Sequence, residues 1–114
     1  MSDQIGDLST LYTKLTVINE SLEQLFPHGN NPFQIMTRLL EECGELAQQV
    51  NHFEGQGVKN QKHGSPNRAQ LAKEVQDVLR CTLQIVQYYG LEADLALSVD
   101  ASYQKVIAQE KSGR

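Results

Sequence analysis

The hydrophobic positions of this chain recur at the spacing of an α-helix, and no segment shows the strict alternation of a strand. From Leu8 to Leu25, leucine and isoleucine return every three or four residues, which predicts one amphipathic helix. Two prolines and a glycine then fall within residues 27–32, a combination through which a helix does not continue. The first helix is therefore expected to end just before this turn.

A second helix is expected from about Phe33 to Phe53. Its apolar stripe consists of Leu39, Leu40, Cys43, Leu46, Ala47 and Val50. A polar stretch with three glycines follows over residues 54–67, and its Ser65-Pro66 pair predicts a helix N-cap followed by proline in the first turn. We interpret this stretch either as a loop that closes over phosphates or as a solvated connector.

The helical pattern continues in two more segments. The third helix carries apolar residues from Leu71 to Tyr89, and Gly90 is its expected C-terminal stop. The fourth runs from about Glu92 to Gln109 with a weaker apolar stripe. Four helices without a strand predict an all-α, four-helix bundle-like fold.

Length and composition indicate one small domain over residues 1–114. Because a chain of this size buries only about two-thirds of its surface, we expect it to form a homo-oligomer, a dimer or larger. Ten basic and fourteen acidic residues give a net charge of −4 without a basic stripe, which argues against binding a nucleic-acid polymer. No apolar run reaches the roughly 20 residues of a membrane span, and the N-terminus lacks the pattern of a signal peptide. With Cys43 and Cys81 as reduced thiols, a cytoplasmic location is predicted.

The second and third helices carry acidic residues in matching register. When their apolar positions are superimposed, Glu42 and Glu45 coincide with Glu74 and Asp77. The first acid of each pair lies roughly 90° from the centre of its apolar stripe, and the second roughly 150°. If the helices pack antiparallel about a local two-fold axis, the four carboxylates are expected to meet on one flank.

Four carboxylates at one place repel one another, and a divalent cation would relieve that repulsion. Oxygen ligands without cysteine or histidine in register favour Mg²⁺ or Mn²⁺ over zinc or copper. The alternative is a solvated polar face, which is the usual role of acids at this spacing. A di-iron carboxylate bundle is excluded, because none of the three histidines follows a glutamate at a distance of three residues.

At these acids the chain resembles the MazG-like, all-α nucleoside triphosphate pyrophosphohydrolase superfamily, over about residues 33–110. The family pattern is Glu-Glu-x-x-Glu on one helix and Glu-x-x-Asp on the next long helix, found here at residues 41–45 and 74–77. The resemblance implies a helical bundle that assembles as a dimer or tetramer and binds Mg²⁺. It also implies hydrolysis of a nucleotide between its α and β phosphates, which releases a monophosphate and pyrophosphate.

The resemblance further implies roles for individual acidic residues. The metal ligands would be Glu42, Glu45, Glu74 and Asp77. Glu41 would lie beside them and orient or deprotonate the attacking water, so Glu41 and Glu42 are the expected catalytic residues.

Four basic residues are candidates for contacting the substrate, namely Arg38, Lys73, Arg80 and Lys105. Arg38 flanks the acids as in the family, whereas Lys73 and Arg80 would reach either a phosphate or a neighbouring carboxylate as an ordinary ion pair. Lys105 matches a phosphate-contacting lysine on the last helix of many relatives. Ser102 stands where those relatives have asparagine, so the resemblance does not carry over a base preference.

Two alternatives to the hydrolysis of (d)NTPs remain open at this point. Phosphoribosyl-ATP pyrophosphohydrolase is a relative with similar acids, although its surrounding sequence is less similar. The other alternative is a non-catalytic helical module, whose apolar stripes drive oligomerisation and whose acids lie on the surface or bind a structural cation.

Overall fold

The computed structural model describes residues 8–55 and 67–111. Within these ranges the chain forms four helices and no strand, so the predicted all-α fold is confirmed. The helices are α1 (Leu8–Leu25), α2 (Pro32–Phe53), α4 (Arg68–Tyr89) and α5 (Glu92–Lys111). None of these helices is long and apolar enough to cross a membrane.

The first turn of α2 shows how the preceding turn is converted into a helix. Asn31 is the N-cap, and its side-chain oxygen accepts a hydrogen bond from the backbone N–H of Gln34 at 2.9 Å. The side chain of Gln34 accepts from the backbone N–H of Asn31 at 3.2 Å, which completes a capping box. Pro32 follows at a position where no helical hydrogen bond needs its missing N–H. Because such a cap contributes about 1 kcal/mol, the start of α2 is fixed locally.

The two ends of α4 are also set by local chemistry, and one of them differs from the prediction. The N-cap is Asn67, whose side-chain oxygen accepts from the N–H of Gln70 at 2.8 Å. The expected cap at Ser65 is therefore wrong, and Ser65 and Pro66 lie outside the described residues. Serine and asparagine are almost equal as caps, so residue preference alone did not separate the two positions. At the other end Gly90 adopts φ 64°, a left-handed conformation that glycine reaches without strain, as predicted.

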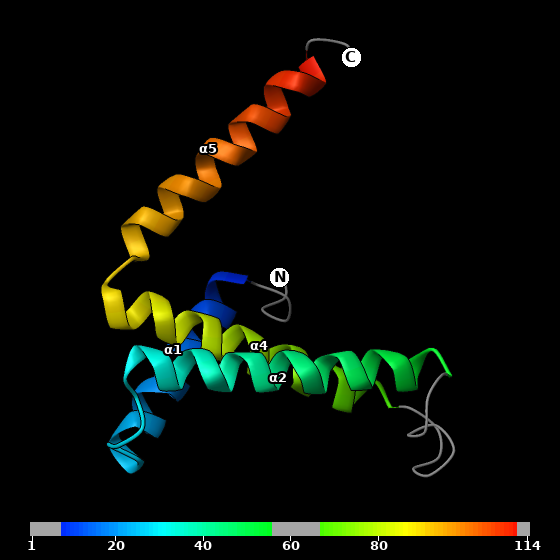
Figure 1. Cartoon of the computed structure of the whole chain (residues 1–114). Coiled ribbons are helices and arrows are strands. Elements are labelled where there is room, and N and C mark those ends of the chain that lie inside the picture. The colour runs from blue at the N-terminus through cyan, green and yellow to red at the C-terminus, as the bar shows by residue number, and fades with distance from the viewer. Residues whose placement is uncertain (1–7, 56–66, 112–114) are drawn as a thin grey trace.

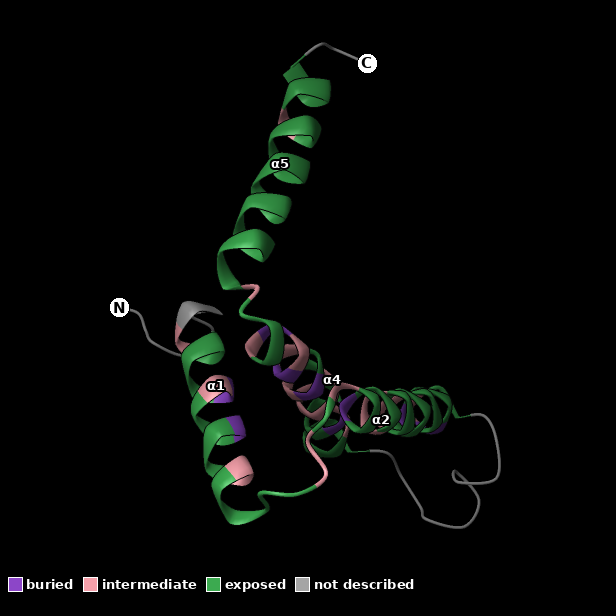
Figure 2. Ribbon diagram, turned by 60° about the vertical axis from the view of Figure 1, so that its left-hand side comes forward, coloured by how far each residue is buried: buried purple, intermediate pink, exposed green. Residues whose placement is uncertain are grey.

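Helices α2 and α4 lie side by side and antiparallel, as the order of colours in Figure 1 shows. Helix α1 packs against α4, and α5 leaves the end of α4 and projects away from the other three. No residue of α5 is buried, whereas α1, α2 and α4 all contribute buried positions (Figure 2). The small apolar core consists of Leu15, Ile35, Cys81 and Val86.

Helices α2 and α4 bury several polar residues. Buried polar positions are Gln49 and His52 on α2 and Glu74 and Gln84 on α4. By contrast, Leu40 in the predicted stripe of α2 is 66% exposed, and Val75 and Leu79 of α4 are also exposed. A single chain therefore leaves much of the predicted apolar stripes of α2 and α4 exposed. Helical periodicity identifies an apolar face, but it does not identify the partner that covers it.

Candidate metal centre

Three acidic side chains converge where α2 and α4 lie against each other. Glu42 and Glu45 are one turn apart on α2, and Glu74 belongs to α4. One carboxylate oxygen from each residue lies within 4.8 Å of the other two. The antiparallel packing of the two helices thus brings together three of the four predicted metal ligands, which we call the carboxylate cluster.

Two oxygens of the carboxylate cluster are buried without a hydrogen-bond partner among the described residues. They are Oε1 of Glu42 and Oε1 of Glu74. The other oxygen of Glu74 accepts from Nε2 of Gln70 at 3.0 Å, and the residue as a whole is only 8% exposed. Leaving a buried polar atom unpaired costs about 1–3 kcal/mol, and more when the group is charged. A divalent cation would satisfy both oxygens together, so the residues present fit a metal ion.

The electrostatic surroundings of Glu42 agree with this interpretation. Burial raises the pKa of its carboxyl group, and the negative charges of Asp77, Glu45 and Glu74 raise the pKa further. The guanidinium of Arg80 acts in the opposite direction and lowers the same pKa. Without a cation, these surroundings therefore disfavour the ionised form of Glu42.

Asp77, the fourth predicted ligand, is close enough to act on Glu42 but has a different partner. Nζ of Lys73 lies 3.0 Å from one oxygen of Asp77 and 3.1 Å from the other. The two residues are one turn apart on α4, and the lysine side chain is largely exposed. Of the two roles considered for Lys73, the structure shows the ion pair.

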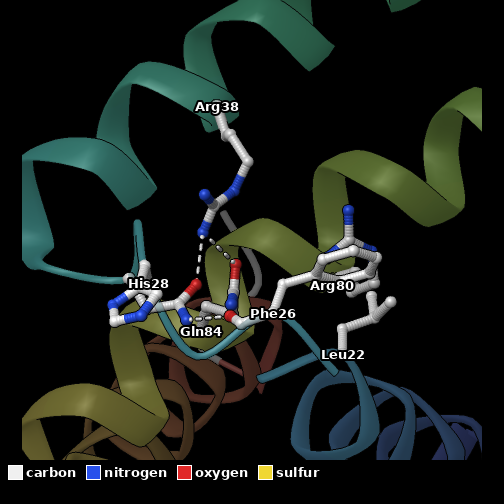
Figure 3. Close-up of a pocket in the computed structure, with 7 residues that line it drawn as sticks. Leu22, Phe26, His28, Arg38, Arg80 and Gln84 are labelled. Atoms are coloured by element: carbon white, nitrogen blue, oxygen red, sulfur yellow. Dashed lines mark hydrogen bonds between the residues drawn. The ribbon is translucent and has the colours of Figure 1, made fainter. Parts of the chain in front are cut away.

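Arg38 and Arg80 line a cavity next to the carboxylate cluster. Arg38 donates to the backbone oxygen of Gly29 at 2.8 Å and to the side-chain oxygen of Asn30 at 3.2 Å. It also donates to Oε1 of Gln84 at 3.4 Å, which links α2 to α4. Figure 3 shows Gln84 on one side of this cavity and Arg80 on the other. Both arginines are therefore held near the cluster by the fold.

A family model for the MazG nucleotide pyrophosphohydrolase domain matches residues 30–112, which is most of the chain. This chain belongs to the MazG nucleotide pyrophosphohydrolase domain family. The match includes all of α2 and α4, and hence every acidic residue of the cluster. Searches of curated proteins and of solved structures gave no match.

Two further residues predicted for this MazG domain do not join the cluster. Glu41 precedes Glu42 on α2, and its side chain is exposed. Lys105 is exposed on α5, which projects away from α2 and α4 (Figure 1). The loop predicted over residues 54–67 lies mostly outside the described part of the chain, because residues 56–66 are not described.

Sequence reasoning missed two buried amides of the MazG domain, Asn19 and Gln84, which are 0% and 2% exposed. Nδ2 of Asn19 donates to the backbone oxygen of Arg80 at 2.9 Å. A signal for Asn19 was present, because it follows Leu15 by four residues and precedes Leu22 by three, on the apolar side of α1. A polar residue at such a position is buried with a partner, and that partner is α4.

Proposed function

We propose that this MazG domain is a Mg²⁺-dependent hydrolase that cleaves nucleoside triphosphates between the α and β phosphates. The observation that carries the proposal is the pair of buried, unpartnered oxygens of Glu42 and Glu74 within a cluster of three carboxylates. Acids that only decorate a surface stay hydrated, because burying an unpaired charge is unfavourable. Membership of the family supplies the reaction class, nucleotide pyrophosphohydrolysis.

In this proposal Glu42, Glu45 and Glu74 hold the cation, and Asp77 becomes a fourth ligand by turning away from Lys73. The ion pair opposes this only weakly, since the lysine is largely exposed and a pair one turn apart on a helix contributes about 0.3–0.5 kcal/mol. A divalent charge among three carboxylates attracts Asp77 more strongly than one mobile ammonium group does. The ligand oxygens favour Mg²⁺, with Mn²⁺ as the alternative.

Bound Mg²⁺ supplies positive charge that offsets the phosphate oxygens and makes a water molecule easier to deprotonate. We assign Glu41, exposed beside Glu42 on α2, to orient the attacking water and accept its proton. As the water oxygen bonds to the α phosphorus, the bond from that phosphorus to the bridging oxygen breaks. Pyrophosphate leaves with the bridging oxygen, and the products are a nucleoside monophosphate and pyrophosphate.

The basic residues divide between two parts of the substrate. Lys73, once released from Asp77, is free to contact the phosphate chain. Arg38 and Arg80 line the cavity beside the cluster and are placed to contact the remainder of the nucleotide. Because Lys105 belongs to α5, which projects away from α2 and α4 (Figure 1), we assign it to the site of a second copy.

The apolar residues that a single chain leaves exposed support self-association. On α5 they include Leu95, Val99, Tyr103 and Val106, which recur at helical spacing. On the outer side of α2 they include Leu40 and Val50. A 20-residue helix with no buried side chain is not stable by its own propensity alone, so it requires another surface. We therefore propose a homodimer or homotetramer, and a cytoplasmic location where nucleotides are available.

The test is a panel of ribo- and deoxyribonucleoside triphosphates and phosphoribosyl-ATP, each incubated with the protein and Mg²⁺ and resolved by anion-exchange chromatography. We expect a monophosphate and pyrophosphate in equal amounts, and no product after addition of EDTA. Glu74→Gln is expected to reduce kcat/KM by more than about 100-fold, since even residues that only support metal ligands contribute about 10–100-fold. Glu20→Gln, at an exposed position of α1, is the matched control.

Three results would contradict the proposal. A diphosphate with orthophosphate as the products would place cleavage at the wrong bond. Equal activity with and without EDTA would exclude a requirement for the metal. If none of the triphosphates is hydrolysed, the proposed reaction is excluded. Circular dichroism of Glu74→Gln separates a lost site from a lost fold.

A further inference from the structure

The cavity beside the carboxylate cluster has a volume of about 250 Å³ and no role in the cleavage of the phosphate chain. Its walls come from the last turns of α1, the turn before α2, and facing positions of α2 and α4. Arg38 lies one turn before Glu42 on α2, and Arg80 lies one turn after Asp77 on α4. One helical turn is about 5.4 Å, so the cavity is within the length of a nucleotide from the cluster.

Most polar groups of this cavity are already occupied inside the protein. Arg38 donates to Gly29 and Asn30, which fixes the orientation of its guanidinium. Gln84 accepts from Arg38 through its oxygen and donates through its nitrogen to Glu23 at 3.3 Å. Gln84 therefore has both ends in use and supports Arg38.

Arg80 is the group with unused capacity. A guanidinium carries five N–H donors, and among the described residues Arg80 uses one of them, over 3.4 Å to Oδ1 of Asn19. The described part of the chain gives it no ion pair, although its charge reaches Glu42. A half-buried guanidinium with free donors favours a ligand rich in hydrogen-bond acceptors.

Apart from Asn30, whose amide is already hydrogen-bonded to Phe26 and Arg38, the other walls of the cavity are apolar or aromatic. Leu22 and Phe26 lie on the same side as Arg80 in Figure 3, and His28 lies across from them. A phosphate group is strongly hydrated and gains nothing from such walls. A planar base gains by burial and by contact with aromatic faces. Free guanidinium donors on Arg80 beside apolar and aromatic walls therefore fit a flat ring that carries hydrogen-bond acceptors at one edge.

We propose that this cavity receives the base of the nucleotide and that Arg80 selects bases with a carbonyl oxygen at the edge they present, namely guanine, thymine and uracil. The proposal rests on the hydrolase function proposed above and adds its specificity. Guanine offers O6 and N7, and thymine and uracil offer O4, all of which accept from a guanidinium. Adenine and cytosine place an amino group there, so a donor would face a donor. A matched contact of this kind is expected to discriminate by roughly tenfold or more.

Asn19 is the positioning residue for this selection. It is fully buried, and its side-chain nitrogen donates to the backbone oxygen of Arg80 and, at 2.8 Å, to Oε1 of Gln87. Its side-chain oxygen accepts from the guanidinium of Arg80. Through this residue α1 fixes the backbone of α4 and orients the arginine into the cavity.

The test measures binding of dGMP, dTMP, dAMP and dCMP to the Mg²⁺-loaded protein by isothermal titration calorimetry, because monophosphates bind without turnover. We expect dGMP and dTMP to bind at least tenfold more tightly than dAMP and dCMP. In Arg80→Ala this preference is expected to fall to less than threefold. Lys14→Ala, which removes a positive charge from an exposed position of α1, is expected to keep the preference. If Arg80→Ala does not fold, Arg80→Lys keeps the charge without the planar fork and is expected to lose most of the preference.

Equal binding of the four monophosphates by the wild type, or no binding at all, overturns the proposal. An equal loss for all four in Arg80→Ala, with weaker binding of inorganic pyrophosphate, also overturns it, because Arg80 then contacts phosphate. The hydrolase function is judged separately from turnover of the triphosphates. If nucleotides with all bases are bound and hydrolysed equally, the proposed base selection is wrong and the proposed hydrolase function stands. If the bases bind with the expected preference but no triphosphate is hydrolysed, the proposed hydrolase function is wrong and the base-binding cavity stands.

Discussion

Glu42 on α2 and Glu74 on α4 each bury one carboxylate oxygen without a hydrogen-bond partner among the described residues, and their carboxylates approach within 4.8 Å. The two residues belong to antiparallel helices, so this relationship exists only when α2 and α4 are packed. In the proposed function a folded chain therefore has a preformed place for a cation, and an unfolded chain does not. Binding at this place is expected to stabilise the fold.

The first prediction concerns stability in the presence of metal. Mg²⁺ or Mn²⁺ at about 100 times its dissociation constant is expected to raise the free energy of unfolding by about 2.7 kcal/mol. The measurement is thermal unfolding with increasing Mg²⁺. Glu74→Gln is expected to lose this gain and Glu20→Gln to keep it. An equal gain in both variants would show that the ion acts elsewhere.

The second prediction concerns pH in the absence of metal. The pKa of Glu42 in the folded protein is raised above its ordinary value of 4.5, so the folded state holds a proton that the unfolded state has released. Stability is therefore expected to fall as pH rises from about that value through the raised pKa. Urea unfolding at a series of pH values in EDTA measures this fall. In Glu42→Gln the fall is expected to be smaller, and an unchanged pH profile would contradict the assignment.

The third prediction concerns the competition for Asp77. Lys73→Gln removes the ammonium group that holds Asp77 at 3.0 Å. Because the lost ion pair contributes only about 0.3–0.5 kcal/mol, the stability of the metal-free protein is expected to change little. Mg²⁺ binding without nucleotide is expected to tighten, while KM for the nucleotide rises. Calorimetry and steady-state kinetics measure the two effects, and weaker Mg²⁺ binding would show that Lys73 supports the site rather than competes for it.

The fourth prediction concerns assembly. Val99 is 59% exposed on α5 and belongs to its apolar stripe. Val99→Glu places a charge in that stripe and is expected to shift the protein towards the monomer in sedimentation velocity experiments. Gln104→Glu adds the same charge at another exposed position of α5 and is expected to leave the assembly intact. Identical sedimentation of both variants and the wild type would place the interface elsewhere.

Much of this fold follows from local signals in the sequence. The span of α1 and the stop at Gly90 were predicted correctly, because periodic leucines and a glycine act within a few residues. The grouping of Glu42, Glu45 and Glu74 was also expected from their matching register. What the register did not reveal is how deeply each acid lies, since Glu74 is buried and Glu42 half-buried while Glu45 is exposed.

The remaining features depend on partners that are distant in the sequence. Asn19 and Gln84 carry no motif, and their importance appears only when α1 and α2 meet α4. The placement of Lys105 depends on where α5 goes after Gly90, and the apolar pattern of α5 does not specify its partner. Periodicity describes one helix at a time, whereas these features are relationships between helices.

The carboxylate cluster and a set of exposed apolar residues belong to the same pair of helices, α2 and α4, and this has a thermodynamic consequence. In the proposed function a cation would bind at the carboxylate cluster of this helix pair, and a second copy of the chain would cover its exposed apolar residues. If metal binding and self-association both favour the packed pair of helices, each of them strengthens the other by the same factor. Apparent Mg²⁺ affinity is therefore expected to weaken as the protein is diluted, and the midpoint of dilution-driven dissociation to move to lower concentration when Mg²⁺ is added.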